Sequence, residues 1–158
     1  MIVLLMGVSG AGKTTVGAAL ASELGWQFAD ADDYHSPANI EKMRSGIPLT
    51  DADRAPWLES LRAIVLRWID ERRNGILACS ALRAAYRDRL LVAPEVRLVY
   101  LKAGRDLLRQ RLHDRKGHYM RESMLESQID TLEEPDRALV IDASQPPARI
   151  VAEIRKNL

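Results

Sequence analysis

A glycine-rich segment near the N-terminus carries the strongest indication of chemistry. Residues 7–14 read G-V-S-G-A-G-K-T, the pattern G-x-x-x-x-G-K-T, and directly follow the apolar run 2–6. A strand that leads through such a turn into a helix presents unpaired N–H groups and the positive end of the helix dipole to an anion. The glycines let the backbone wrap phosphate oxygens, the lysine reaches the β- and γ-phosphates, and the threonine hydroxyl can ligate Mg²⁺. The segment therefore predicts a nucleoside triphosphate site. The residues expected to hold the nucleotide here are Gly7, Ser9, Gly10, Ala11, Gly12, Lys13, Thr14 and Thr15.

Three aspartates, Asp30, Asp32 and Asp33, follow the next short apolar run. A carboxylate at this place could accept the proton of an attacking hydroxyl, and another could orient Mg²⁺. We expect Asp32 to be the base, and Asp30 to be either the metal partner together with Thr14 or a group that orients the metal site from behind. A helix cap or a solvated turn is the usual role of clustered aspartates. Beside a phosphate loop we favour the catalytic interpretation, because phosphoryl transfer needs a metal and a positioned nucleophile.

Basic residues crowd the stretch 105–121. A cation that arrives with a closing flap would neutralise the charge that builds on the equatorial oxygens of a transferring phosphoryl group. The candidates are Arg111, Arg115 and Lys116, and any one of them could equally be a solvated surface charge. Elsewhere, forked hydrogen bonds from arginine could grip an anionic acceptor, and histidines in polar loops could bind a polyol. The residues concerned are Arg54, Arg83, Arg87, His35 and His118, whereas His113 is expected on a helix surface.

Length and composition fit a single domain in a reducing compartment. The chain has 158 residues, enough for one real core, and 23 basic against 22 acidic residues leave a formal net charge of +1. This balance gives no support for a nucleic-acid or membrane partner. The lone cysteine, Cys79, lies in an apolar run and is expected to be buried, in agreement with a reducing compartment. No apolar run approaches the length of a membrane span, so we expect a cytoplasmic protein.

Short apolar runs alternate with longer amphipathic ones, which predicts an α/β fold with a parallel sheet. We expect strands at 2–6, 26–29, 76–79, 96–101 and 139–141, a first helix that ends at Gly25, a short helix within 36–45, a long helix capped by Thr50 and Asp51 with Trp57 and Trp68 on its core face, and a closing helix at 146–157. The span from 111 to 122 lacks an apolar face and is expected to form a mobile flap. Because ligands gather at the carboxyl ends of parallel strands, we expect the phosphate loop, the aspartates and Ser80 to converge.

Several long motifs are specific to one family. They are G-V-S-G-A-G-K-T at 7–14, D-A-D-D-Y-H at 30–35, N-I-E-K-M-R-S-G-I-P-L-T-D-A-D-R-A-P-W-L at 39–58, A-C-S-A-L-R-A-A-Y-R-D at 78–88, R-K-G-H-Y-M at 115–120 and L-E-S-Q-I-D-T-L-E-E-P at 125–135. With these motifs the chain resembles the gluconokinases of the short, P-loop type, relatives of the shikimate kinases within the nucleoside-monophosphate-kinase-like fold. The resemblance covers almost the whole length.

The resemblance implies a three-layer α/β/α sandwich with a five-stranded parallel sheet, forming one P-loop kinase domain over residues 1–158. It further implies a helical lid at about 111–122, an acceptor-binding segment at about 32–58, and compatibility with a homodimer. The activity it implies is ATP- and Mg²⁺-dependent transfer of the γ-phosphoryl group to the 6-hydroxyl of D-gluconate.

The same resemblance assigns roles to single residues. Asp32 would hold and deprotonate the sugar hydroxyl, and Ser80 would sit near the phosphate path. Arg111 would stack on adenine opposite the loop that ends at Pro146, and Arg115 would approach the phosphates. The residues implied on the acceptor side are His35, Lys42, Arg54 and Arg87. Arg83 stands where lysine is usual, which puts its detailed role in doubt, and His118 and Gln128 fall in family motifs without a derived role.

Two other functions fit parts of the sequence. The first is a kinase of another small hydroxy acid such as shikimate, and the second is a nucleotide-binding module without an acceptor. The segment 39–58 favours gluconate, because the acceptor side should differ most between kinases. The aspartates and the basic span disfavour a module that only binds nucleotide, since such a module would not need both.

Overall fold

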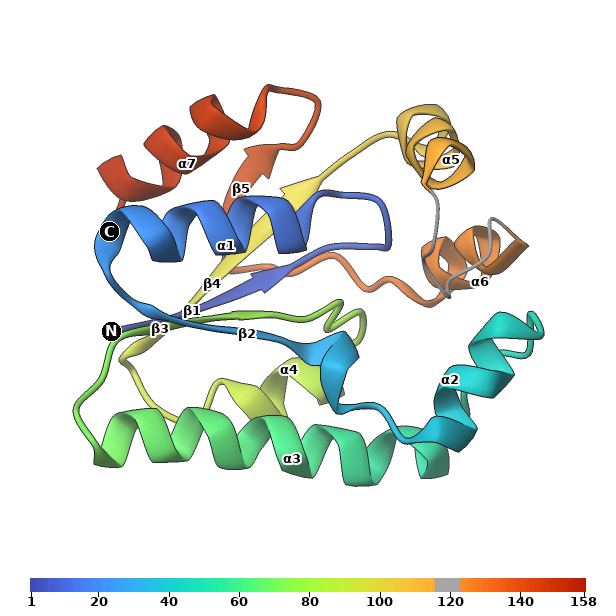
Figure 1. The fold of residues 1–158 in the computed structure, drawn as a ribbon, viewed down its shortest axis with the longest axis horizontal. Helices are drawn as coiled ribbons and strands as arrows, with labels where there is room; N and C mark the ends of the chain where they lie inside the picture. The colour runs from blue at the N-terminus through green and yellow to red at the C-terminus, as the bar shows by residue number, and fades with distance from the viewer. Residues whose placement is uncertain (116–122) are drawn as a thin grey trace.

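A five-stranded parallel sheet lies between two layers of helices (Figure 1). The computed structural model describes residues 1–115 and 123–158, and everything below refers to these residues. The elements in chain order are β1 (Ile2–Met6), α1 (Lys13–Leu24), β2 (Gln27–Asp30), a short 3₁₀ turn (Ala31–Tyr34), α2 (Pro37–Arg44), α3 (Asp51–Asp70), β3 (Gly75–Ala78), α4 (Ala84–Leu90), β4 (Val96–Lys102), α5 (Arg105–Asp114), α6 (Ser123–Thr131), β5 (Leu139–Asp142) and α7 (Pro147–Lys156).

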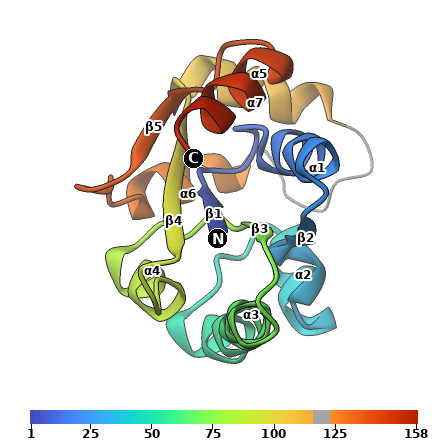
Figure 2. The ribbon, with the colours of Figure 1, turned by 90° about the vertical axis from the view of Figure 1, so that its left-hand side faces the viewer.

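The strand order is β2-β3-β1-β4-β5, and all pairs are parallel. Every residue of β1 and β3 is buried, as expected for central strands covered on both faces. Helices α1 and α7 cover one face and α3 and α4 the other, which Figures 1 and 2 show from two directions. The neighbouring strands β1 and β3 thus lead to helices on opposite faces. Such a switch point opens a crevice at the carboxyl ends of the strands, which is where α/β folds bind their ligands.

Local sequence explains why the first helix and the longest helix begin and end where they do. Helix α1 starts after Gly12 and stops at Gly25, both in the left-handed region that glycine adopts at little cost. Thr50 and Asp53 form a reciprocal capping box at the start of α3. The face of α3 that carries Leu61 and Trp68 is buried in the core. These features confirm Gly25 as the end of α1, Thr50 as the cap of α3 and the predicted core face of α3, whereas the second capping residue is Asp53 and not Asp51.

Most predicted elements are present, with boundaries displaced by one or two residues. Asp30 is the last residue of β2 rather than the first after it. The sequence predicts no bounds for α4, α5 or α6, although the expectation of His113 on a helix surface is confirmed by α5. The expected flap at 111–122 is wrong for its first residues, because 111–114 form the last turn of α5. Leu108 and Leu112, four residues apart on one face of α5, are both buried. This apolar face extends into the span that was expected to lack one.

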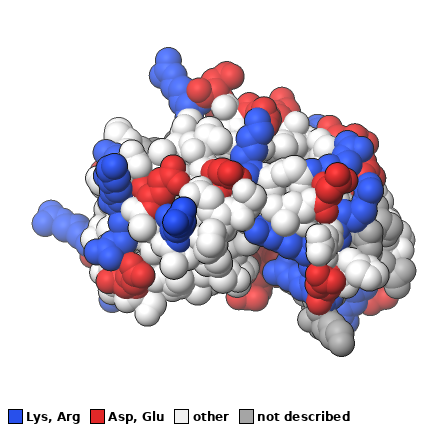
Figure 3. Space-filling model, turned by 90° about the horizontal axis from the view of Figure 1, so that it is seen from above, with Lys and Arg blue, Asp and Glu red and all other residues white. Residues whose placement is uncertain are grey.

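Other expectations concern burial and surface charge. Cys79 is buried, as predicted, and burial raises the pKa of its thiol to about 12. The face that carries α1 and α7 shows basic and acidic side chains interspersed rather than a continuous basic surface (Figure 3). Within residues 1–115 and 123–158, no helix combines the length and the apolar character needed to cross a membrane.

Candidate active site

The loop between β1 and α1 is shaped by close backbone approaches. A Cβ atom at Gly7 would lie 2.9 Å from the carbonyl oxygen of Leu101, and Gly12 has φ of 99°. The Gly7 N–H donates to the Ser80 carbonyl across the crevice at 3.4 Å, and the Ala11 N–H donates to the Val8 carbonyl at 3.1 Å. The first N–H groups of α1 have no partner within the helix, because the chain before them turns away. The loop therefore offers an anion a row of helix-terminal donors.

Lys13, the first residue of α1, lies over this loop. Its Nζ donates to the carbonyl oxygens of Gly7 at 2.7 Å and Val8 at 3.1 Å. Burial lowers the pKa of the ammonium, while the nearby carboxylates of Asp32 and Asp30 oppose that shift. The geometry holds a cation against the loop, at the place where a bound phosphate would replace the two carbonyls as its partner.

Asp30 organises the crevice from the end of β2. Its Oδ1 accepts from the Asp32 N–H at 3.0 Å, and its Oδ2 accepts from the Thr14 hydroxyl. One carboxylate thus fixes both the backbone that carries Asp32 and the hydroxyl at the start of α1. A hydroxyl and a carboxylate in contact are oxygen donors of the kind that Mg²⁺ prefers. The described residues hold no cluster of three His, Cys, Asp or Glu that could bind a metal ion.

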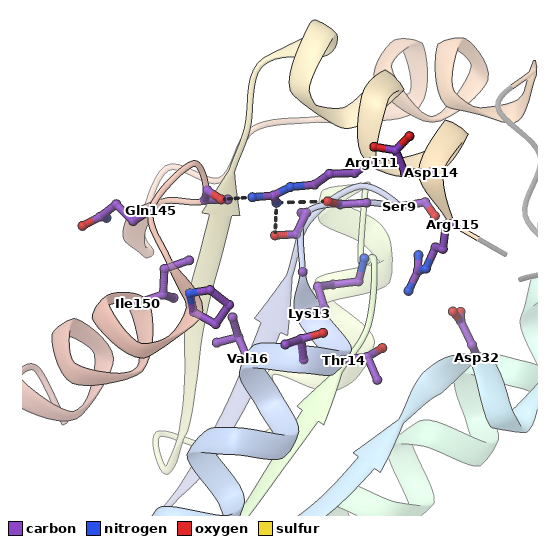
Figure 4. A pocket seen from close by; sticks show the side chains of 16 residues that line it. Ser9, Lys13, Thr14, Val16, Asp32, Arg111, Asp114, Arg115, Gln145 and Ile150 are labelled. Carbon is purple, nitrogen blue, oxygen red and sulfur yellow. Dashed lines mark hydrogen bonds between the residues drawn. The ribbon is translucent and has the colours of Figure 1, made fainter.

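A cavity of about 390 Å³ opens over the phosphate loop (Figure 4). One side of it is bounded by Arg111, whose Nη1 donates to the carbonyls of Gly10 at 3.2 Å and Ala11 at 3.3 Å and whose Nη2 donates to Ala143 at 2.8 Å. On the other side, Arg115 and Asp32 point toward each other (Figure 4). The lining residues are Ser9, Gly10, Ala11, Gly12, Lys13, Thr14, Thr15, Val16, Asp32, Arg111, Asp114, Arg115, Ala143, Gln145, Pro147 and Ile150.

A second, narrower cavity of about 70 Å³ adjoins the first. The two cavities share Ser9, Lys13 and Asp32. The second cavity is lined by Ser9, Lys13, Asp32, His35, Met43, Leu49, Arg54, Trp57, Ser80, Leu82, Tyr86, Ser127, Gln128 and Thr131. A group bound in the large cavity and a group bound in the small one would therefore meet at a wall that carries a lysine and an aspartate.

Arg54 enters the second cavity with its guanidinium held by neighbours. Its Nη1 donates to the Tyr86 hydroxyl at 3.1 Å, and that hydroxyl donates to Asp51 Oδ1 at 2.6 Å. Burial and Asp51 raise the pKa of Tyr86, so the hydroxyl keeps its proton. The chain of hydrogen bonds orients a positive charge toward the cavity, as recognition of a small anion requires.

His35 lines the same cavity and stacks on Trp57, with ring centroids 4.2 Å apart and planes inclined by 13°. The Trp57 Nε1 donates to the Ala31 carbonyl at 2.7 Å, which fixes the turn that carries Asp32. Burial, with a smaller contribution from Arg54, lowers the pKa of His35 to about 4. The imidazole is therefore neutral at physiological pH and can serve as a hydrogen-bond donor and acceptor.

The lowered pKa of His35 predicts how stability changes with pH. Between pH 6.5 and about 4 the unfolded chain binds a proton at His35 that the folded chain does not, so stability falls as the pH falls through this range. Between pH 7.5 and 4.5 we expect the Tm of the wild type to fall by about 2–4 °C more than the Tm of His35→Gln. Thermal melts across this range test it, with His113→Gln, on the exposed side of α5, as the control. Equal slopes for His35→Gln and the wild type would contradict the expectation.

Several residues predicted to bind substrate or nucleotide lie outside both cavities. Lys42 Nζ lies 2.9 Å from Asp53 Oδ2, and Asp53 belongs to the capping box of α3. Arg83 is exposed and precedes α4. Arg87 is 5 % exposed and donates from Nη1 to the carbonyls of Ala81 at 2.9 Å and Leu82 at 3.2 Å. The roles of all three as acceptor ligands stay predictions.

The Arg87 guanidinium stabilises the turn at Ala81. Ala81 has φ of 45°, a strained value for a residue with a Cβ atom, and the guanidinium holds its carbonyl in place. Of the remaining predicted residues, Gly7, Asp30 and Pro146 line neither of these two cavities. Pro147 lines the large one, and the nucleotide contact of Pro146 stays a prediction. His118 lies outside the described residues.

The structure also brings residues to the site that sequence reasoning left out. Trp57 was expected only in the core, and it is 5 % exposed, yet its ring also bounds the second cavity. Tyr86 and Gln128 stood in the family motifs without a role. Their positions in motifs were the available signal, but the partners that define their roles are distant in sequence: Tyr86 contacts residues 32 and 35 positions away, and Gln128 contacts Ser9, 119 positions away.

Comparison with known proteins identifies the family. A family model described as an AAA domain matches residues 2–135. A protein named probable gluconokinase from Xenopus tropicalis is 44 % identical over an alignment of 173 positions, which covers 98 % of this chain and 91 % of that protein. The chain belongs to the gluconokinase family.

Solved structures agree with this membership of the gluconokinase family. The crystal structure of a gluconokinase from Sinorhizobium meliloti 1021 is 41 % identical, superposes with a TM-score of 0.81, and covers 98 % of this chain and 93 % of that one. A shikimate kinase from Aquifex aeolicus is 19 % identical with a TM-score of 0.63, covering 99 % of this chain and 95 % of that one. The second likeness concerns the fold alone, and it confirms the predicted α/β P-loop kinase architecture.

Proposed function

We propose that this protein is a gluconokinase that transfers the γ-phosphoryl group of ATP to the 6-hydroxyl of D-gluconate. The observation that carries the proposal is the shared wall of the two cavities, formed by Ser9, Lys13 and Asp32, in a chain of the gluconokinase family. The large cavity is the place for ATP, with its triphosphate on the loop after β1. The small cavity is the place for gluconate, with its reacting hydroxyl at the shared wall.

In this proposal Asp32 is the general base. The 6-hydroxyl gives its proton to the Asp32 carboxylate while its oxygen forms a bond to the γ-phosphorus, and the bond from that phosphorus to the bridging oxygen of ADP breaks. Lys13 and Arg115 neutralise the charge on the transferring group. The hydrogen bond from the Asp32 N–H to Asp30 fixes the backbone from which the base extends.

The contact between Thr14 and Asp30 supports a place for Mg²⁺ beside the triphosphate. Thr14 would contribute its hydroxyl and Asp30 its carboxylate, and the ion would draw charge from the phosphate oxygens. On the other side of the nucleotide, Arg111 and the loop that ends at Pro146 would contact adenine. The planar guanidinium of Arg111, fixed by three carbonyls, suits that role.

The acceptor side must recognise a carboxylate and several hydroxyls. Arg54 supplies the positive charge, and His35 and Ser80 supply polar groups in the same cavity. The predicted lid at about 111–122 includes His118, and most of it lies outside the described residues. The helices on either side of this segment are tied together, because Glu126 of α6 pairs with Arg109 of α5 at 2.9 Å and with Arg105 at 3.2 Å.

An acceptor panel tests the proposal. Purified protein with ATP and Mg²⁺ should release ADP in the presence of D-gluconate, measured by a coupled assay, and phosphorus NMR of the product should show a phosphate on the 6-oxygen. The control panel contains shikimate and other sugar acids. Equal or faster turnover of shikimate would contradict gluconate as the substrate and favour a shikimate kinase. ADP release that no acceptor changes would favour a nucleotide-binding module.

The family resemblance also leads us to propose a homodimer in the cytoplasm. The buried thiol of Cys79 agrees with a reducing compartment. Light scattering of the purified protein would measure its mass in solution, and a monomer at micromolar concentration would contradict the proposed homodimer.

A further inference from the structure

A side chain from α6 reaches into the phosphate loop. The Ser9 N–H donates to Gln128 Oε1 at 2.7 Å. Ser9 is 8 % exposed and is one of the three residues that both cavities share, whereas Gln128 lines only the acceptor cavity. The contact therefore joins the acceptor side of the site directly to the loop that is to hold the triphosphate.

Apolar packing aims Gln128 at this place. Leu125, three residues earlier on α6, is 1 % exposed and packs in one buried cluster with Leu108 and Leu112 of α5. Residues three apart on a helix lie on the same face, so anchoring Leu125 turns Gln128 toward the body of the molecule. The direction of the side chain is thus set by the core.

The end of α6 is fixed on the other wall of the crevice. The Glu133 N–H donates to the Leu82 carbonyl at 2.7 Å, and Glu133 Oε1 accepts from the Ala84 N–H at 3.2 Å. These contacts tie the chain after α6 to the loop between β3 and α4, which carries Ser80. Helix α6 consequently spans from the loop after β3 to the loop after β1, and Gln128 is the residue through which it holds Ser9.

We propose that Gln128 is a positioning residue for phosphoryl transfer. By accepting from the Ser9 N–H, its amide fixes the shared wall of the two cavities, and with it the distance between the γ-phosphate and the acceptor hydroxyl. A neutral amide can accept from this N–H without adding negative charge beside a triphosphate. A carboxylate at the same place would add a negative charge. The inference rests on the proposed function for its reaction, but the hydrogen bond itself does not depend on the acceptor.

The first test measures the hydrogen bond without any substrate. NMR of nitrogen-15-labelled protein gives the exchange rate of the Ser9 amide proton. We expect Gln128→Leu, which keeps the bulk of the side chain but lacks the acceptor, to speed that exchange about tenfold, and Gln128→Glu to keep it near the wild-type rate. Asp130→Asn, an exposed position on the same helix, is the matched control and should leave the rate unchanged. An unchanged rate in Gln128→Leu would overturn the inference.

The second test separates positioning from a merely structural role. Gln128→Leu should lower kcat by about tenfold with less than about twofold change in KM for ATP, because a misplaced phosphate still binds. Gln128→Glu should keep kcat within about threefold and raise KM for ATP, because it restores the acceptor atom and adds charge. A lower Tm with kcat and KM changing in parallel in both variants would overturn the inference, and so would faster Ser9 exchange with an unchanged kcat.

The two proposals fail in different ways. If the wild type does not phosphorylate gluconate, the proposed function is wrong, and the kinetic comparison is made with whichever acid of the panel is phosphorylated. If the wild type is active on gluconate and Gln128→Leu matches it in kcat, the proposed function stands and the role of Gln128 is wrong.

Discussion

Replacement of Asp32 by asparagine is expected to lower kcat for gluconate phosphorylation by about 10²–10⁴-fold, the usual contribution of a general base. Asparagine keeps the size of the side chain and the backbone N–H that donates to Asp30, so the turn should stay in place. What is lost is the group that takes the proton from the attacking hydroxyl. KM for ATP should change by less than about threefold, since the nucleotide contacts come from the loop after β1.

The control for Asp32 is its neighbour. Asp33 belongs to the same 3₁₀ turn, is exposed and lines neither cavity, and Asp33→Asn should have near wild-type kinetics. Steady-state assays with saturating gluconate and varied ATP measure both parameters. A kcat for Asp32→Asn within about fivefold of the wild type would remove Asp32 from the role of base.

The second large effect is expected at Lys13. Lys13→Ala should lower kcat/KM for ATP by about 10²–10³-fold, because it removes the charge that opposes the developing negative charge of the transferring group. Lys13→Arg keeps a positive charge but replaces a compact ammonium by a planar fork, which does not fit the two carbonyls of Gly7 and Val8, so it should recover only part of the rate.

Stability should separate Lys13 from a structural residue. Burial already disfavours its charged form, so loss of the ammonium should change Tm by only a few degrees. Lys102→Ala, which breaks an exposed pair with Glu134, is the control for removing a lysine and should keep full activity. Full activity of Lys13→Ala would contradict the assignment of the phosphate loop.

The sequence predicted well the features that depend on neighbouring residues. The strand, glycine turn and helix over residues 2–24 follow one another along the chain, and glycine at position 12 and the caps of α3 act within a few residues. The convergence of the phosphate loop, Asp32 and Ser80 could also be predicted, because a parallel sheet places the carboxyl ends of its strands at one edge.

The partners of long polar side chains could not be predicted in the same way. Arg87 has the residue type of an anion ligand, but the strained turn at Ala81 uses its guanidinium. Lys42 likewise meets Asp53 because α2 and the start of α3 lie together in the fold. Which group a flexible cation contacts depends on tertiary packing that the residue type does not encode, and the same holds for Gln128 and Ser9.

The order of the strands has a consequence for how the protein is made. Strand β1 is synthesised first, yet its two neighbours in the sheet are β3 and β4, which end at residues 78 and 102. The loop after β1 therefore lacks the support of both neighbouring strands until residue 102 has left the ribosome. Pairing over such sequence separations closes large loops and slows folding. During this interval β1, which is apolar on both faces, lacks both neighbouring strands, so we expect it to bind chaperones in the nascent chain.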